Sequence, residues 1–406
     1  MIDRFETDAS ARVYDPAVMR SAVVVGVGCL GLLACPGGQE KVVVARSVAP
    51  PQVTGRPGIG GARVVQLVAE DDNTCALLDD GEVACWGAPW GPYGVAPGRI
   101  PGLRDVQSVA LGDDHLCALH RDGGVSCGGD NERNELAREP HGRAQPFARV
   151  DGLAGVTAIF AGDRDTCVLG AAGLTCWGDS YSSGKQPGRR ATYGQELHIR
   201  EAGVSQYDNV WLTDSGQVLW WGAPLYYESH YGRYSTYPGA PLEVRIPGAA
   251  RDVCAGSWHS CAIAGAGTVH CWGMTGAGAQ RLGFIWNREW WPDSPEIVLD
   301  EIETPPAAVD VADAVELACG DHHTCARLGS GIIKCWGAPA LQGAGPTEVY
   351  TARAVIGVTD AIRLAAGGEH TCALLGSGTI VCWGDLLWRS EEERLNRVPV
   401  EVPRGG

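Results

Sequence analysis

One repeated stretch constrains this chain more than any other feature of its sequence. The stretch is clearest from His370 to Gly384, and seven copies of it can be counted along the 406 residues. Successive copies lie about fifty residues apart, which is the period of propeller-type repeats. The cores of the copies run from Cys75 to Trp86, Cys117 to Cys127, Cys167 to Trp177, Val210 to Trp221, Cys261 to Trp272, Cys325 to Trp336 and Cys372 to Trp383.

Each copy predicts a β-hairpin. Both halves of a copy alternate apolar and polar residues, which is the pattern of a half-buried strand. A glycine stands between the halves, six positions after the first cysteine position, and it suits a hairpin turn that needs a positive φ. These glycines are Gly81, Gly123, Gly173, Gly216, Gly267, Gly331 and Gly378.

Paired cysteines face each other across most of the predicted hairpins. They stand ten residues apart, or nine in the third copy, and therefore lie opposite each other on antiparallel strands, within reach of a disulfide. The fourth copy has Val210 and Trp220 instead, so both cysteines are missing together, as expected of bonded partners. We predict disulfides between Cys75 and Cys85, Cys117 and Cys127, Cys167 and Cys176, Cys261 and Cys271, Cys325 and Cys335, and Cys372 and Cys382.

Two further cysteines, Cys254 and Cys319, fall outside the hairpin scheme. They lie in the segments that precede the fifth and sixth hairpins, one position apart in register. A disulfide between the two units and a pair of buried thiols both remain open for them. None of the cysteines shows Cys-x-x-Cys spacing, so we predict no metal site and no cofactor. Disulfides persist in oxidising compartments, which predicts that the chain leaves the cytoplasm.

The segments around each hairpin complete a four-stranded unit. An apolar segment such as Leu103 to Gly112 precedes the hairpin, and a further short strand, such as Arg99 to Pro101, opens a repeat and gives about four strands per unit. Four strands repeated seven times predict an all-β, seven-bladed β-propeller that covers residues 62–406. We expect the tail from Arg397 to Pro403 to complete blade one and so close the ring. Gly128 replaces the tryptophan of the second copy, which predicts a less well packed blade.

The amino-terminal segment predicts export. The apolar run from Ala22 to Leu33 is too short to span a bilayer but suits a signal peptide. Leu32-Leu33-Ala34-Cys35 resembles the lipobox of bacterial lipoproteins, which implies that Cys35 is lipidated. We therefore expect residues 1–35 to be a signal peptide, with translation starting at Met19, and residues 36–61 to be a Pro/Gly-rich tether. An ordinary signal peptide, cleaved elsewhere, is the alternative.

The repeat as a whole resembles that of a known family. His370-Thr371-Cys372-Ala373-Leu374, followed by Cys382-Trp383-Gly384, looks like the repeat of the regulator of chromosome condensation family, in the Cys-containing form of bacterial secreted proteins and lipoproteins. The resemblance implies a propeller that binds proteins. One bacterial relative inhibits β-lactamase, whereas the nuclear member exchanges nucleotide on a small GTPase and binds chromatin. Neither nuclear role suits an exported chain with a net charge of −16, and this charge also argues against nucleic acid.

The polar residues of the repeat are interpreted as structural. A histidine stands two positions before the first cysteine in four copies, as His115, His259, His323 and His370. These histidines could form a ring of metal ligands, but we expect them to be polar residues that cap turns. We predict no catalytic residues, and Gly178-Asp179-Ser180 only continues a Cys-Trp-Gly motif.

Two aromatic insertions break the period and are the candidate binding loops. They follow the fourth and fifth hairpins, so we expect them side by side on one face, where large rings suit recognition. Rings that fold back to cover their own loops are the alternative. The candidate residues are Tyr226, Tyr227, Tyr231, Tyr234, Trp286, Trp290 and Trp291.

These observations predict a non-catalytic binding module. We expect a monomer at the bacterial cell envelope, in the membrane only through its lipid, that binds a protein or a surface glycan. One alternative is a structural envelope or coat component without a dedicated ligand. The other is a propeller that inhibits an enzyme.

Overall fold

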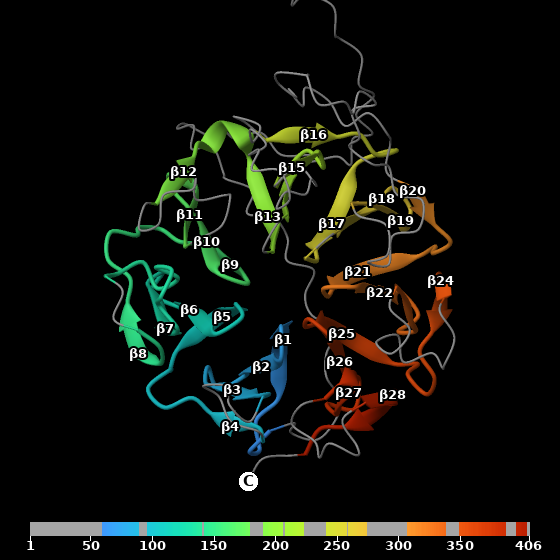
Figure 1. Ribbon diagram of the computed structural model, residues 1–406, viewed down its shortest axis with the longest axis horizontal. Coiled ribbons are helices and arrows are strands. Elements are labelled where there is room, and N and C mark those ends of the chain that lie inside the picture. Colours follow the sequence, from blue (N-terminus) through green and yellow to red (C-terminus); the bar gives the residue numbers. More distant parts are fainter. Residues whose placement is uncertain are drawn as a thin grey trace, which may run out of the picture. The chain divides into compact units, whose positions relative to one another are not determined.

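Seven four-stranded antiparallel sheets account for nearly all regular structure in the computed structural model. It describes residues 59–88, 96–139, 142–178, 190–205, 208–222, 241–257, 259–273, 307–337, 349–386 and 395–403. Within this part of the chain the sheets surround a common axis as the blades of a propeller (Figure 1). The prediction of an all-β, seven-bladed propeller is confirmed.

The strands of each blade follow one another from the axis outward. The innermost strands are β1 (Val64–Glu70), β5 (Val106–Leu111), β9 (Ala158–Gly162), β13 (Ile199–Val204), β17 (Ala250–Ala255), β21 (Ala314–Cys319) and β25 (Ala361–Ala366). The second strands are β2 (Asn73–Leu78), β6 (His115–His120), β10 (Asp165–Gly170), β14 (Asp208–Thr213), β18 (His259–Ala264), β22 (His323–Leu328) and β26 (His370–Leu375).

The outer half of each blade is built in the same order. The third strands are β3 (Val83–Trp86), β7 (Val125–Gly129), β11 (Gly173–Gly178), β15 (Val218–Gly222), β19 (Thr268–Gly273), β23 (Ile333–Gly337) and β27 (Ile380–Asp385). The outermost strands are β4 (Gly98–Arg99), β8 (Gln145–Arg149), β12 (Ala191–Tyr193), β16 (Leu242–Val244), β20 (Ala307–Val309), β24 (Val349–Ala354) and β28 (Leu395–Glu401). A single 3-10 turn, η2 (Gln195–Leu197), is the helical structure among the described residues.

The second and third strands form the predicted hairpins. Cys372 lies directly opposite Cys382, and the other five hairpin pairs match in the same way. The Cα atoms of each pair are 4.1 Å apart, close to the shorter of the two spacings in an antiparallel ladder. The turn glycine Gly378 has a φ of 82°, a conformation in which a side chain would be strained. The hairpin prediction is therefore confirmed.

The two ends of the blades define two faces. We call the end with the turns between first and second strands the mouth face, and the end with the hairpin turns the hairpin face. The third strands β15 and β19 finish on the mouth face, because Gly222 and Gly273 pair with the first residues of β14 and β18. The aromatic insertions follow these two strands in the sequence. Their candidate residues, from Tyr226 to Trp291, lie outside the described residues.

Tryptophans of the repeat fill the spaces between blades, with one substitution. Trp86, Trp177, Trp336 and Trp383 are at most 1% exposed. In blade two, a Cβ on Gly128 would come within 2.8 Å of the Phe147 ring, so a phenylalanine from β8 occupies the space of the missing tryptophan. The outer strand thus supplies a partly buried ring where the repeat motif lacks one.

The ring closes differently from the prediction. β28 pairs with β27, where Val381 lies opposite Glu401, and so completes blade seven. Blade one has its own outer strand, β4. Among the described strands, every repeat unit therefore forms a whole blade from its own four consecutive strands. A hydrophobic cluster closes the ring instead: Ile59 and Ala62 lie in the same core as Ile380 and Val402.

The amino-terminal predictions cannot be compared with these strands. Residues 1–58, which include Cys35 and most of the expected tether, lie outside the described residues. Among the residues that are described, no helix has the length and apolar character required to cross a membrane.

Candidate functional site

The mouth-face turns converge on the axis and are bonded to one another. The backbone N–H of Asp113 donates to the carbonyl of Asp163 in the next blade at 3.0 Å. Likewise Asp321 donates to Gly368 at 3.1 Å, and Gly368 donates to Asp71 at 2.8 Å. These bonds run around the axis from blade to blade. They hold the turns of separate blades in fixed relative positions, which is what a composite surface requires.

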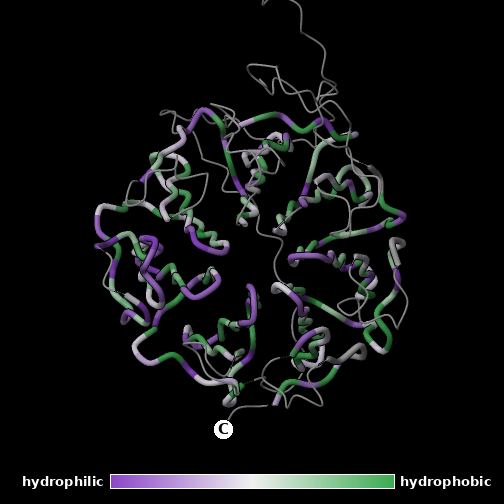
Figure 2. The backbone as a smooth tube through the Cα atoms, in the orientation of Figure 1, coloured by the Kyte–Doolittle hydropathy of each residue, from purple (hydrophilic) through white to green (hydrophobic). Residues whose placement is uncertain are grey.

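Carboxylates from four blades meet at this position, and we call them the axial acidic cluster. Its members are Glu70, Asp71, Asp113, Asp163 and Asp321. The Glu70 side chain is hydrogen-bonded to that of Asp163, and the Asp113 side chain to that of Asp71. Figure 2 shows hydrophilic residues at the inner ends of these blades, in contrast to the apolar strands behind them.

Burial raises the pKa of three of these acids. Desolvation raises the pKa of Glu70 well above its ordinary value, and the nearby charges of Asp163 and Asp321 raise it further. Desolvation raises the pKa of Asp163 to about 6, and desolvation together with the Asp71 charge raises that of Asp113 to about 8. A hydrogen bond between two carboxyl groups requires one proton, so each pair holds a proton near neutral pH. The cluster can therefore take up and release protons in the physiological range.

A second set of polar side chains links the innermost strands deeper along the axis. The Gln66 amide accepts from the backbone N–H of Val109 and donates to its carbonyl, both at 3.0 Å. Asp252 and Glu316 take the same position in blades five and six, and each accepts from the next innermost strand. Desolvation raises the pKa of Asp252 and Glu316, because these carboxyls face the axis among neighbouring blades. The position serves to join blades.

The four repeat histidines also join blades, which corrects the expectation that they cap turns. Each buried Nε2 lies within hydrogen-bond distance of a threonine hydroxyl in the next blade. The pairs are His115 with Thr166 at 2.8 Å, His259 with Thr324 at 2.6 Å, His323 with Thr371 at 2.6 Å and His370 with Thr74 at 2.7 Å. Burial lowers the pKa of His115, His259 and His370 to about 4, so these rings are neutral at pH 7.

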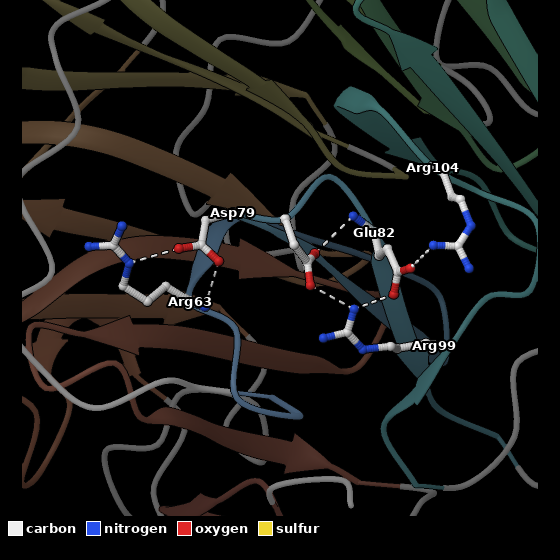
Figure 3. Close-up of polar contacts among 6 residues, drawn as sticks. Arg63, Asp79, Glu82, Arg99 and Arg104 are labelled. Atoms are coloured by element: carbon white, nitrogen blue, oxygen red, sulfur yellow. Dashed lines mark hydrogen bonds and ion pairs between the residues drawn. The ribbon is translucent and has the colours of Figure 1, made fainter.

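The hairpin face of blade one carries an ion-pair network (Figure 3). Arg99 bonds to Asp80 at 2.7 Å and also to Glu82, while Arg104 reaches the other Glu82 oxygen at 2.6 Å. Arg63 bonds to Asp79 at 2.8 Å. These side chains range from 21% exposed at Glu82 to 74% at Arg104, so solvent reaches every pair and each contributes little stability. The network fixes the hairpin turn of this blade and offers no enclosed site.

The cysteines occupy the positions that the sequence analysis assigned to them. The sulfur atoms of all six hairpin pairs lie at bonding distance, and so do those of Cys254 and Cys319. The latter pair joins blade five to blade six across 65 residues of sequence. The sequence left open whether Cys254 and Cys319 form a bridge or remain two free thiols. In this structure they form the bridge.

Sequence reasoning missed the axial acidic cluster, although a signal for it was present. An aspartate follows a glycine at or just after the end of the innermost strand in Gly112-Asp113, Gly162-Asp163 and Gly320-Asp321. A periodic acid just after a strand indicates a turn that repeats around the ring. Glu70 stands at the glycine position itself in blade one, where it reaches Asp163 two blades away.

Comparisons with known proteins agree with this architecture. The family described as "Regulator of chromosome condensation (RCC1) repeat" matches residues 106–135 and 361–385. Human Alsin is 31% identical over 142 residues, which cover 34% of this chain and 8% of Alsin. Mouse RCC1 domain-containing protein 1 is 26% identical over 171 residues, which cover 35% of this chain and 44% of that protein.

Solved structures share the fold over most of the chain. Yeast RCC1 (Prp20), solved bound to Kap60, superposes with a TM-score of 0.64 at 17% identity, over 90% of this chain and 91% of that one. Human WBSCR16 gives a TM-score of 0.61 at 18% identity, over 76% of this chain and 84% of that one. Repeat motif, blade topology and these likenesses lead to one conclusion: the chain is a seven-bladed β-propeller, and two of its segments match the repeat of the regulator of chromosome condensation family.

Proposed function

We propose that this propeller is an exported, non-catalytic binding module that captures another protein through its mouth face. The observation that carries the proposal is the convergence of bonded turns from several blades at that face, with the axial acidic cluster at the centre. A surface made of fixed turns from separate blades suits recognition, because such turns lose little conformational entropy when a partner binds. The module acts as a monomer and needs no cofactor.

A protein is the partner class that we favour over a surface glycan. Yeast Prp20 has been solved bound to Kap60, and its structure was described together with its binding to Gsp1p and histones. These are partners of that protein and not of this chain. They support the proposal only in that the same fold binds proteins elsewhere.

Capture from envelope extract tests the proposal. We expect a mouth-face variant that combines Asp114→Asn and Glu369→Gln, both at exposed positions, to lose the partner. A matched control, Asp214→Asn with Asp360→Asn, removes two exposed acids from the hairpin face and should retain it. Equal capture by both variants would place the binding surface elsewhere, and absence of any stoichiometric partner would favour the structural component.

The aromatic insertions extend the proposed surface. We propose that Trp290 and Trp291 contact the partner, because the strand that precedes them ends on the mouth face. Replacing both with alanine should abolish capture and leave the melting temperature unchanged. A lower melting temperature with normal capture would instead mean that these rings pack against their own loop.

Export and lipid anchoring complete the proposal. Seven cysteine pairs at bonding distance support a non-reducing compartment, since reduced thiols prevail in the cytosol. We propose that Cys35 carries the lipid and holds the protein at the bacterial cell envelope. Metabolic labelling with palmitate should therefore disappear in Cys35→Ala, and labelling that persists in this variant would rule out the anchor.

A further inference from the structure

Two cysteine pairs lie against each other between blades five and six. The sulfur atoms of Cys254, Cys261 and Cys319 are all within 4.8 Å of one another. Cys254 is joined to Cys319 across the two blades, whereas Cys261 is joined to Cys271 within blade five. Sulfurs in bonds of this kind are not thiolates and do not bind metal. Their proximity instead suits exchange between one bridge and the other.

These four cysteines differ in how far solvent reaches them. Cys261 and Cys271 are at most 1% exposed, and the ten cysteines of the other hairpin pairs are fully buried. Cys254 is 8% exposed, while Cys319 is only partly buried at the end of β21, near the mouth face. Because access limits thiol attack, an external thiol reaches Cys319 before any other bonded cysteine in the described part of the chain.

The strand register provides a second bonding arrangement. Cys261 lies opposite Cys271 on one side and opposite Cys254 on the other. A residue that makes the close, non-hydrogen-bonded pair with one neighbouring strand makes the hydrogen-bonded pair with the other, at a Cα separation of about 5.5 Å. That separation falls in the middle of the range for disulfides. Cys254 and Cys261 can therefore be bridged without a change of strand pairing.

We propose that this cluster is a thiol–disulfide exchange site for an exported thiol. The thiolate of the incoming thiol attacks the Cys319 sulfur, forms a mixed disulfide and releases Cys254 as a thiolate. Cys254 then attacks Cys261, a Cys254–Cys261 bond forms, and Cys271 leaves as a thiolate that takes a proton. No oxidant is needed, since each step exchanges one disulfide for another.

The exchange changes what the bond connects. Before it, blade five is tied covalently to blade six. After it, the new bond lies within blade five, and Cys319 carries the external thiol at the mouth face. The Thr324 hydroxyl lies 3.9 Å from the sulfurs of both Cys261 and Cys319, which are the two atoms attacked in the exchange. The site thus converts a link between blades into a covalent attachment point.

Peptide mapping of the full-length oxidised protein tests the proposal. The protein is incubated with reduced glutathione, quenched with acid, alkylated in urea and digested without reduction. We expect glutathione on Cys319, a Cys254–Cys261 linkage and an alkylated Cys271. The Cys254–Cys319 bridge should open at least about tenfold faster than the other five hairpin bridges, which serve as controls within the same molecule. Opening of all bridges at one rate would overturn the proposal.

Two variants separate exchange from general unfolding. Cys319→Ser leaves Cys254 as a free thiol beside Cys261, so the Cys254–Cys261 linkage and an alkylated Cys271 should form without glutathione. A Cys261–Cys271 bridge that stays intact in this variant would contradict the proposed relay. Cys254→Ser with Cys319→Ser contains no attacking thiol, and in it the Cys261–Cys271 bridge should resist glutathione as the other hairpin bridges do.

Discussion

The junction between blades five and six and the junction between blades seven and one solve the same problem by different means. At the first, the Cys254–Cys319 bridge and the Asp252 carboxylate, which accepts from the Leu317 N–H at 2.6 Å, join consecutive blades. At the second, a chain end must meet a chain start, and no cysteine pair joins the described residues of these two blades. In the described part of the chain, apolar packing and hydrogen bonds close the ring.

The closing junction nevertheless repeats most contacts of the others. His370 and Thr74 are 2.7 Å apart although 296 residues separate them, and this pair matches His259 and Thr324 at the covalent junction. The added feature is the hydrophobic cluster that combines Ile59 with Val402. Closure thus depends on the last strand and on a short segment before the first. The predictions below test that dependence, from the largest effect to the smallest.

Removal of the closing strand should have the largest effect. A chain that ends at residue 394 lacks β28, which exposes β27 and removes Val402 from the closing cluster. We expect the free energy of unfolding to fall by at least about 5 kcal/mol, the scale of losing a large buried side chain. Thermal unfolding followed by circular dichroism measures this. An unchanged melting temperature would mean that the ring does not depend on closure.

Loss of the Cys254–Cys319 bridge between blades should have the second largest effect on the free energy of unfolding. Cys254→Ser with Cys319→Ser removes a crosslink over 65 residues, worth roughly 4 kcal/mol from the entropy of loop closure. The matched control, Cys325→Ser with Cys335→Ser, removes one over 10 residues, worth roughly 3 kcal/mol on the same scale. Denaturant unfolding of both variants compares them. A larger loss in the control would show that burial outweighs loop length here.

The threonine partners allow the two junctions to be compared directly. Thr74→Val and Thr324→Val each leave a buried histidine ring without its hydroxyl partner, at a cost of about 1 to 3 kcal/mol. We expect faster hydrogen exchange in β1 and β25 for Thr74→Val, because nothing covalent holds that junction. In Thr324→Val the Cys254–Cys319 bridge should keep β17 and β21 protected. Equal exchange at both junctions would mean that the bridge does not restrain local opening.

A dependence on pH should be the smallest effect. The pKa of Asp163 is raised to about 6 and that of Asp113 to about 8, from a reference of 3.8. At these two groups the folded state binds more protons than the unfolded state, so their contribution to stability is full below about pH 4 and is lost as the pH rises toward 8. Asp113→Asn should flatten this slope in melts across that range. A slope that is unchanged or reversed in the variant would exclude Asp113 as its source.

Much of the structure could be predicted from the spacing of residues within each repeat. The alternation and turn glycine of each copy, together with the paired cysteines, correctly indicated the hairpins, the register of Cys372 with Cys382, and the number of blades. These features depend on residues about ten positions apart, so they can be read from the chain itself. Contacts between blades depend on residues about fifty or more positions apart, which short-range spacing does not reveal.

By itself, the sequence determined the repeat unit, because hairpin geometry is a short-range property. Only the tertiary structure decided how the units meet: that β28 stays in blade seven, that Phe147 replaces a missing tryptophan, and that Glu70 reaches Asp163. The physical reason is that curvature of the ring, set by the packing of all seven sheets, brings distant residues together. No spacing along the chain encodes that curvature.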